Sequence, residues 1–199
     1  MVDPKIDSIL DEGNRLFLKG KLKEAITYYD KILNENPQHL SSLNNKGYAL
    51  SKLKDFENAM KCYDAALEIN PNDLSVLVNK ISSFRKQGNF VEALSLCDKI
   101  LNTNPNYNIA LYHKERILFS MNKFAESILC CDNILKDYPD NGDVLFDKSC
   151  SLVMLSKIDE ALNLLERAIS QGNQYKIKAK KSKVFEKFFN DSRFKELIS

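Results

Sequence analysis

The sequence predicts an all-α protein, a solenoid built from stacked pairs of helices. Four prolines stand 34 residues apart, at Pro37, Pro71, Pro105 and Pro139. Small residues share this period, because four alanines and one serine occupy a single repeat position, at Ala25, Ala59, Ala93, Ser127 and Ala161. Self-similarity at a fixed period of this length is typical of repeat architectures, in which each unit packs mainly on its neighbours.

Within one repeat, two apolar stripes at helical spacing predict two helices. The first stripe runs through residues 40–53 in steps of three and four and consists of Leu40, Leu43, Ala49, Leu50 and Leu53. The second stripe consists of Phe56, Ala59, Met60, Tyr63, Ala66 and Leu67. The second helix is expected to end at Asn70, because Pro71 lacks a backbone donor and clashes with a preceding helical turn.

The crossing of these two helices is predicted from residue size. Gly47 on the first helix and Ala59 on the second allow a close approach of the two backbones. Tyr63 is expected to be the large buried side chain that fills the remaining space. In the third and fourth repeats, Ile81 and Glu115 replace this glycine, and we expect each to loosen or shift its helix pair. A carboxylate at a buried position needs a partner or a raised pKa, so we favour local pairing of Glu115, or its exposure to solvent, over a functional role.

The period predicts one continuous domain of repeats, followed by a C-terminal segment that lacks the repeat motif. Five repeats are predicted over residues 1–175, at about 6–39, 40–73, 74–107, 108–141 and 142–175, followed by capping helices in residues 176–199. This last segment holds seven lysines and one arginine against three acidic residues. Its lysines at helical spacing, Lys176, Lys180, Lys183 and Lys187, suit a solvated cap better than a surface for nucleic acid or an acidic membrane, since arginines and exposed aromatics are not interleaved with them.

Composition excludes several classes of protein. With 199 residues, 44% hydrophobic and 28% charged, and a net charge of +2, the chain is typical of a soluble protein. The first residues, MVDPKIDS, contain acids and no apolar core, so we expect neither a secretory signal nor a membrane span. The five cysteines have no CxxC spacing, so we expect them to fill the core of a protein in a reducing cytoplasm. With only two histidines beside them, we expect no metal site and no cofactor.

On these residues the chain resembles the tetratricopeptide repeat family, whose unit is a helix–turn–helix of 34 residues. The family's usual first-helix tryptophan is replaced in all five units by an aliphatic residue, at Ile9, Leu43, Leu77, Leu111 and Leu145. The resemblance implies a right-handed superhelical α-solenoid, in which the first helices line a concave groove that binds a protein or peptide partner.

The resemblance also places candidate binding residues on the first helices. These are Asn14, Asn44, Asn45, Tyr48, Asn79, Ser82, Tyr112, His113, Arg116 and Phe146. Amides and aromatic rings of this kind suit an extended peptide held by its backbone. The asparagines fit hydrogen bonding between repeats equally well.

Some family members clamp the C-terminal carboxylate of heat-shock chaperones with two asparagines and three basic residues. Asn14 and Asn45 match the asparagine positions, but the basic positions hold an apolar or neutral residue at Leu10, Ser75 and Asn79. Charge-assisted bonds supply most of the strength of such a clamp. A chaperone C-terminal tail is therefore not the expected partner.

The function predicted from the sequence is that of a non-catalytic adaptor. No phosphate-binding loop, dinucleotide fingerprint, HExxH helix or nucleophile elbow occurs in the sequence. His113, Glu115 and Arg116 form the only cluster suited to acid–base work, and consecutive helical residues point in different directions. The alternative is self-association through the solenoid ends or the cap. A monomer is favoured, and the oligomeric state stays open.

Overall fold

The computed structural model describes residues 4–199 and divides the chain into two compact units, an N-terminal unit of residues 1–96 and a C-terminal unit of residues 97–199. The boundary falls inside helix α6 (Phe90–Thr103). Throughout the described residues the regular secondary structure is helical, which confirms the predicted all-α class. We expect no secretory signal at the start of the chain, and residues 1–3 of that segment lie outside the described residues.

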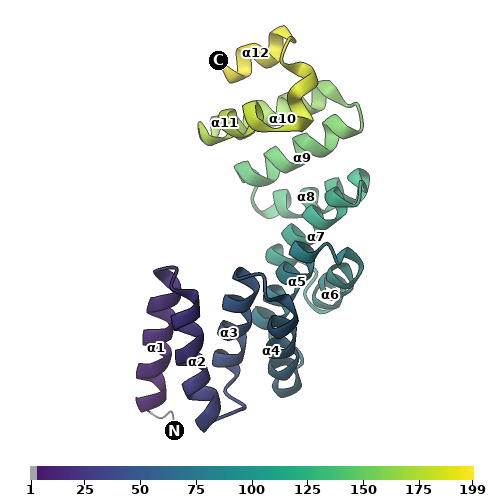
Figure 1. The fold of residues 1–199 in the computed structure, drawn as a ribbon. Helices are drawn as coiled ribbons and strands as arrows, with labels where there is room; N and C mark the ends of the chain where they lie inside the picture. Colours follow the sequence, from purple (N-terminus) through teal and green to yellow (C-terminus); the bar gives the residue numbers. More distant parts are fainter. Residues whose placement is uncertain (1–3) are drawn as a thin grey trace. The chain divides into compact units, whose positions relative to one another are not determined.

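The N-terminal unit is a row of antiparallel helices, each packed on the next (Figure 1). These helices are α1 (Pro4–Leu18), α2 (Leu22–Glu35), α3 (Leu40–Lys52), α4 (Phe56–Ile69) and α5 (Leu74–Gln87). The first helix of each repeat also contacts the first helix of the next, since α1 touches α3 and α3 touches α5. These three first helices therefore share one face of the unit.

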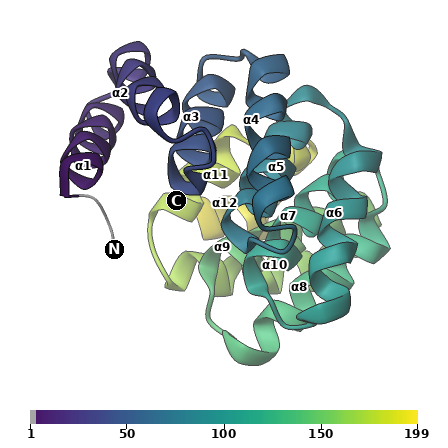
Figure 2. The same cartoon turned by 90° about the horizontal axis from the view of Figure 1, so that it is seen from below.

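The C-terminal unit continues the same arrangement and then departs from it. Its helix pairs are α7 (Asn108–Ser120) with α8 (Phe124–Asp137), and α9 (Gly142–Met154) with α10 (Ile158–Ser170). The chain ends in α11 (Gln174–Lys181), a 3-10 helix η1 (Lys183–Phe188) and α12 (Ser192–Ile198). These last three segments lie against α9 and α10, as both views show (Figures 1 and 2).

The turn between the two helices of a repeat places one residue in the left-handed conformation every 34 residues. The five residues and their φ angles are Gly20 (76°), Lys54 (67°), Gly88 (82°), Asn122 (61°) and Ser156 (62°). Glycine adopts this conformation without the steric penalty that a side chain brings. The turn therefore repeats its backbone geometry even where the residue is unfavourable for it.

The predicted crossing of the helices in the second repeat is confirmed. Tyr63 and Ala59 are fully buried. A Cβ atom on Gly47 would lie 2.7 Å from Cε1 of Tyr63, so the ring occupies the space that any larger residue at position 47 would need. The first repeat is built in the same way, because a Cβ atom on Gly13 would lie 2.8 Å from Cε1 of Tyr29.

In the fourth repeat, a different set of residues packs the two helices together. Glu115 is only 3% exposed, and Ser127, at the alanine position, donates a hydrogen bond of 3.1 Å to its carboxylate. Ser127 also shares a hydrogen bond of 3.0 Å with Ser151 of α9. Cys131 replaces the tyrosine and is fully buried. The expected local pairing of Glu115 is confirmed, and the smaller cysteine leaves room for the larger glutamate.

In the first four repeats, an ion pair joins the second helix to the first helix that follows it. An aspartate and a lysine sixteen residues later recur with the period in the pairs Asp30–Lys46, Asp64–Lys80, Asp98–Lys114 and Asp132–Lys148. The nitrogen–oxygen distance is 2.6 Å in the first and third pairs and 2.5 Å in the fourth. Burial lowers the pKa of Lys114, but its hydrogen bond to Asp98 and the charge of that carboxylate outweigh burial, and the pKa is raised.

The C-terminal segment covers the end of the last helix pair. Phe185 and Phe194 are fully buried in a cluster with residues of α9 and α10, and their rings lie 5.5 Å apart. Tyr175 of α11 packs on Gly142, where an added Cβ atom would lie 2.5 Å from the ring. The segment that covers this end of the pair therefore includes α11 from Gln174. Extended backbone at Ser182 separates α11 from η1, so the lysines of this segment form no continuous helical stripe.

Candidate functional site

The face of α1 and α3 carries a hydrogen-bonded group of amides. Asn45 Nδ2 donates to Asn14 Oδ1 at 2.9 Å, and the hydroxyl of Tyr29 donates to the same oxygen at 3.1 Å. Burial of the Tyr29 ring raises the pKa of its hydroxyl to about 12. Both asparagines are half-buried. The group holds two successive first helices in register and presents its remaining amide atoms on their shared face.

A second amide pair joins α3 to α5. Asn79 Nδ2 donates to Asn44 Oδ1 at 2.9 Å, and Asn44, Asn79 and Ser82 are half-buried. Hydrogen bonding between repeats, one of the two roles predicted for the asparagines, is thus confirmed. Contact with a ligand stays a prediction for these residues.

A pocket of about 230 Å³ opens on the same face of the N-terminal unit. It is lined by Asn14, Phe17, Leu18, Tyr29, Asn45 and Tyr48. The rings of Phe17 and Tyr48 form one wall, with their centroids 5.2 Å apart. The pocket therefore combines aromatic walls with the amides of the asparagine pair.

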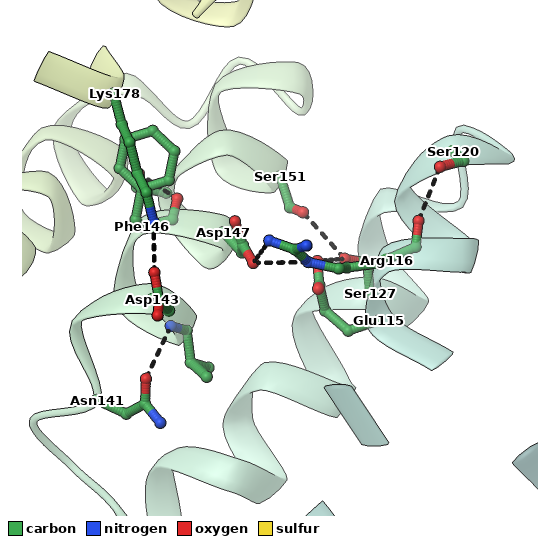
Figure 3. A network of polar contacts seen from close by, with 12 residues as sticks. Glu115, Arg116, Ser120, Ser127, Asn141, Asp143, Phe146, Asp147, Ser151 and Lys178 are labelled. Atoms are coloured by element: carbon green, nitrogen blue, oxygen red, sulfur yellow. Dashed lines mark hydrogen bonds and ion pairs between the residues drawn. The ribbon is translucent and has the colours of Figure 1, made fainter. Parts of the chain in front are cut away.

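The corresponding face of the C-terminal unit is charged. Arg116 of α7 donates from Nη2 and Nε to Asp147 of α9, at 3.3 and 3.4 Å (Figure 3). The guanidinium also lies over the ring of Tyr112, 4.7 Å from its centroid. Burial raises the pKa of Asp147 although Arg116 opposes it, and burial likewise raises the pKa of Tyr112.

The cluster that we considered for acid–base work does not converge on one point. Glu115 is hydrogen-bonded to Ser127 inside the α7–α8 pair, whereas Arg116 reaches Asp147 on α9 (Figure 3). His113 lies half-buried on α7. The two charged side chains are thus engaged with different helices.

Phe146 has a different place from the other predicted binding residues. It is 8% exposed, and its ring centroid lies 6.1 Å from that of Tyr175 and 6.0 Å from that of Phe185. Lys178 lies above it and forms an ion pair with Asp143 (Figure 3). The cap therefore covers Phe146, and we leave it out of the candidate face.

Residues at the C-terminal ends of the first helices also lie at this face, although the sequence did not single them out. Leu18, Lys52 and Lys86 occupy one repeat position in successive units of the 34-residue period. Leu18 lines the pocket, and the two lysines lie within 6 Å of the Tyr48 ring centroid, at 5.3 and 5.9 Å. The same periodic alignment that placed Tyr48 contains this position, one helical turn further along.

The cysteines are packed in the core. All five are buried as free thiols, and burial raises the pKa of Cys97 to about 12 and that of Cys130 to about 11. Such thiols stay protonated and unreactive. Within residues 4–199, no group of histidine, cysteine and carboxylate side chains is arranged to hold a metal ion, and no helix is long and apolar enough to cross a membrane.

Comparison with known proteins agrees with this arrangement. Residues 41–73 match the family model described as tetratricopeptide repeat. A tetratricopeptide repeat protein from Parabacteroides merdae superposes with a TM-score of 0.80 at 17% identity, covering 98% of this chain and 77% of its own. MamA from Desulfovibrio magneticus gives a TM-score of 0.75 at 16% identity, with 85% and 96% covered.

A third similar structure is YrrB, described as a tetratricopeptide repeat protein with an unusual peptide-binding site. It has a TM-score of 0.67 at 17% identity, with 87% of this chain and 91% of its own covered. No curated protein matches the chain significantly in sequence. At these identities the structural similarities establish the fold, and the family match establishes the second repeat.

Proposed function

We propose that this tetratricopeptide repeat protein is a non-catalytic cytoplasmic adaptor, which holds a peptide or a helix of a partner protein on the face formed by its first helices. In the N-terminal unit that face consists of α1, α3 and α5, and in the C-terminal unit it includes α7. Tetratricopeptide repeat proteins bind protein or peptide partners in general. The choice of the first-helix face for this chain rests on its own side chains.

The observation that carries the proposal is the pattern of amide hydrogen bonds. Each pair, Asn14 with Asn45 and Asn44 with Asn79, uses one oxygen and one nitrogen. Each pair therefore has one amide oxygen and one amide nitrogen left for a ligand. A donor and an acceptor side by side suit the N–H and C=O groups of an extended chain or of a helix end. The similarity to YrrB, whose description names a peptide-binding site, supports the same conclusion.

Capture of partners from a cell lysate tests the proposal. Wild-type protein is compared with the double variant Asn79→Ala/Tyr112→Ala, which changes the first-helix face in both units. The control double variant Glu68→Ala/Lys136→Ala changes exposed residues of second helices. We expect the first variant to lose specific partners that wild type and control retain, with similar melting temperatures for all three.

Two results would contradict the proposal. If the first-helix variant retains every partner while the control loses them, the binding surface lies on the second helices. If sedimentation of the pure protein shows assembly that rises with concentration over the micromolar range, and no partner is captured, self-association through the ends replaces the adaptor function.

A further inference from the structure

The pocket between α1 and α3 has the size and lining of a site for one large apolar side chain. Its volume of about 230 Å³ lies below the range of roughly 300–1,000 Å³ that is usual for sites that enclose a whole small molecule. Leu18 stands at its edge and is 84% exposed, which is unusual for a leucine beside two aromatic rings. Covering Leu18 and the rings of Phe17 and Tyr48 would remove apolar surface from water and so stabilise a complex.

The polar part of the pocket matches a peptide backbone. Asn14 Oδ1 accepts from Tyr29 and from Asn45. Asn14 Nδ2 and Asn45 Oδ1 make no hydrogen bond with the described residues of the chain. One donor and one acceptor are therefore left for a ligand, and a peptide group can satisfy both when it is taken out of water.

Two positive charges stand beside the pocket without a counter-ion. Lys52 and Lys86 lie 5.3 and 5.9 Å from the centroid of the Tyr48 ring, and neither forms an ion pair with any described residue. The pKa of Lys86 is lowered by burial and by the charges of Lys52 and Arg85. By contrast, Lys46 on α3 is paired with Asp30. An anionic ligand would relieve the repulsion between the two lysines.

From these three observations we propose that this pocket binds an internal acidic segment of a partner protein. One aromatic side chain of the segment enters the pocket and packs against the wall formed by Phe17 and Tyr48, and its flanking carboxylates pair with Lys52 and Lys86. The inference rests on the proposed adaptor function and names the chemistry of its partner. A nucleic acid would bind the lysines through its phosphates. It would bring neither a peptide group to the paired amides nor an apolar side chain to the exposed Leu18.

A defined peptide tests the inference directly. The probe is a short fluorescent peptide with one central phenylalanine and three glutamates on either side, blocked at both ends so that it carries no terminal carboxylate. Its comparators replace the phenylalanine by alanine, or every glutamate by glutamine. The protein variants are Lys52→Glu/Lys86→Glu, Tyr48→Ala, and the matched charge control Lys23→Glu/Lys61→Glu on second helices. Fluorescence anisotropy gives the dissociation constants, and circular dichroism checks that each variant is folded.

We expect wild type and the charge control to bind the acidic peptide equally. Lys52→Glu/Lys86→Glu should weaken binding by about tenfold or more, because attraction is replaced by repulsion at both sites. Tyr48→Ala, the alanine peptide and the glutamine peptide should each weaken it as well. Absence of binding by wild type up to millimolar peptide would overturn the inference, and so would equal binding of the glutamine peptide or equal loss in the charge control. Binding of a single-stranded oligonucleotide that is lost in Lys52→Glu/Lys86→Glu, without peptide binding, would assign the lysines to nucleic acid instead.

The failure of this inference can be separated from the failure of the adaptor function. If Asn79→Ala/Tyr112→Ala loses lysate partners while the acidic peptide does not bind, the first-helix face is used for a ligand of other chemistry. If the peptide binds as expected and the lysate experiment finds no partner, the assignment of the pocket is supported and the adaptor function is not.

Discussion

The two units place different chemistry on the same positions of the repeat. In the N-terminal unit Asn45 donates to Asn14, and in the C-terminal unit Arg116 donates to Asp147 three periods further along the chain. In each unit the repeating helix pairs fix which positions meet, so the two residues of each contact are 31 apart in sequence. The side chains then decide what the meeting point can do. A neutral amide pair keeps atoms for a ligand, whereas the ion pair satisfies its own charges.

The crossings of the helices in the second and fourth repeats differ in the same coordinated way. The second repeat combines Gly47 with fully buried Tyr63, and the fourth combines buried Glu115 with Cys131. A small residue on one helix thus accompanies a large residue on the other. At the repeat position of Ala59, the fourth repeat has Ser127, which donates the hydrogen bond that the carboxylate needs. The three positions have to be considered as a set.

The largest expected effect comes from emptying the second crossing. Tyr63→Ala should lower the free energy of unfolding by about 3–5 kcal/mol, because the deleted ring leaves a cavity beside Gly47 that the helices cannot close. At the equivalent position of the fourth repeat, Cys131→Ala removes only a sulfur atom and should cost about 1 kcal/mol. Urea denaturation of both variants checks the difference. Equal losses would show that the two crossings do not differ in packing.

A double-mutant cycle tests whether the fourth crossing can be converted into the second. Glu115→Gly alone leaves a cavity, and Cys131→Tyr alone overpacks the crossing by about 1–3 kcal/mol. Together they reproduce the pairing of Gly47 with Tyr63, so the double variant should be more stable than the sum of the single effects by at least about 1 kcal/mol. The cycle is measured by chemical denaturation. Additive effects would mean that the size of the residue at position 115 does not determine which residue fits at position 131.

A smaller effect separates the first repeat from the second. The hydroxyl of Tyr29 donates to Asn14, whereas that of Tyr63 is buried and finds no hydrogen-bond partner among the described residues. Tyr29→Phe should therefore cost about 0.5–1.5 kcal/mol. Tyr63→Phe should be neutral or slightly stabilising, because it removes a buried polar atom without a partner. Thermal unfolding of both variants ranks them, and a greater loss for Tyr63→Phe would contradict the hydrogen-bond assignment.

The repeat architecture could be predicted from the sequence because its signals are local and periodic. Proline at every 34th residue and the pairing of Gly47 with Ala59 and Tyr63 located the helices and their crossing. The accommodation of Glu115 was missed, since it depends on Ser127 and Cys131, which become its neighbours only when two helices pack. The recurring aspartate–lysine pairs obey the same period and could have been found by the same alignment.

The candidate face was predicted in part, for reasons that are also physical. The repeat positions that share a face of the first helices could be predicted, because a helix fixes which positions share a face, and contact of these residues with a ligand stays a prediction. Phe146 was assigned to a binding groove, although its burial depends on how the non-repeating cap folds back over α9. Lys52 and Lys86 were overlooked, since a missing counter-ion is a property of three-dimensional surroundings.

Site-specific photo-crosslinking in cells tests whether the first-helix face binds a partner. A photoreactive amino acid is placed at Ser82 on the first-helix face of the N-terminal unit, or at Glu68 on the second helix α4, and crosslinked partners are identified after irradiation. We expect a partner protein to be crosslinked from position 82 and not from position 68. Crosslinking of the same partner from position 68 alone would contradict this expectation.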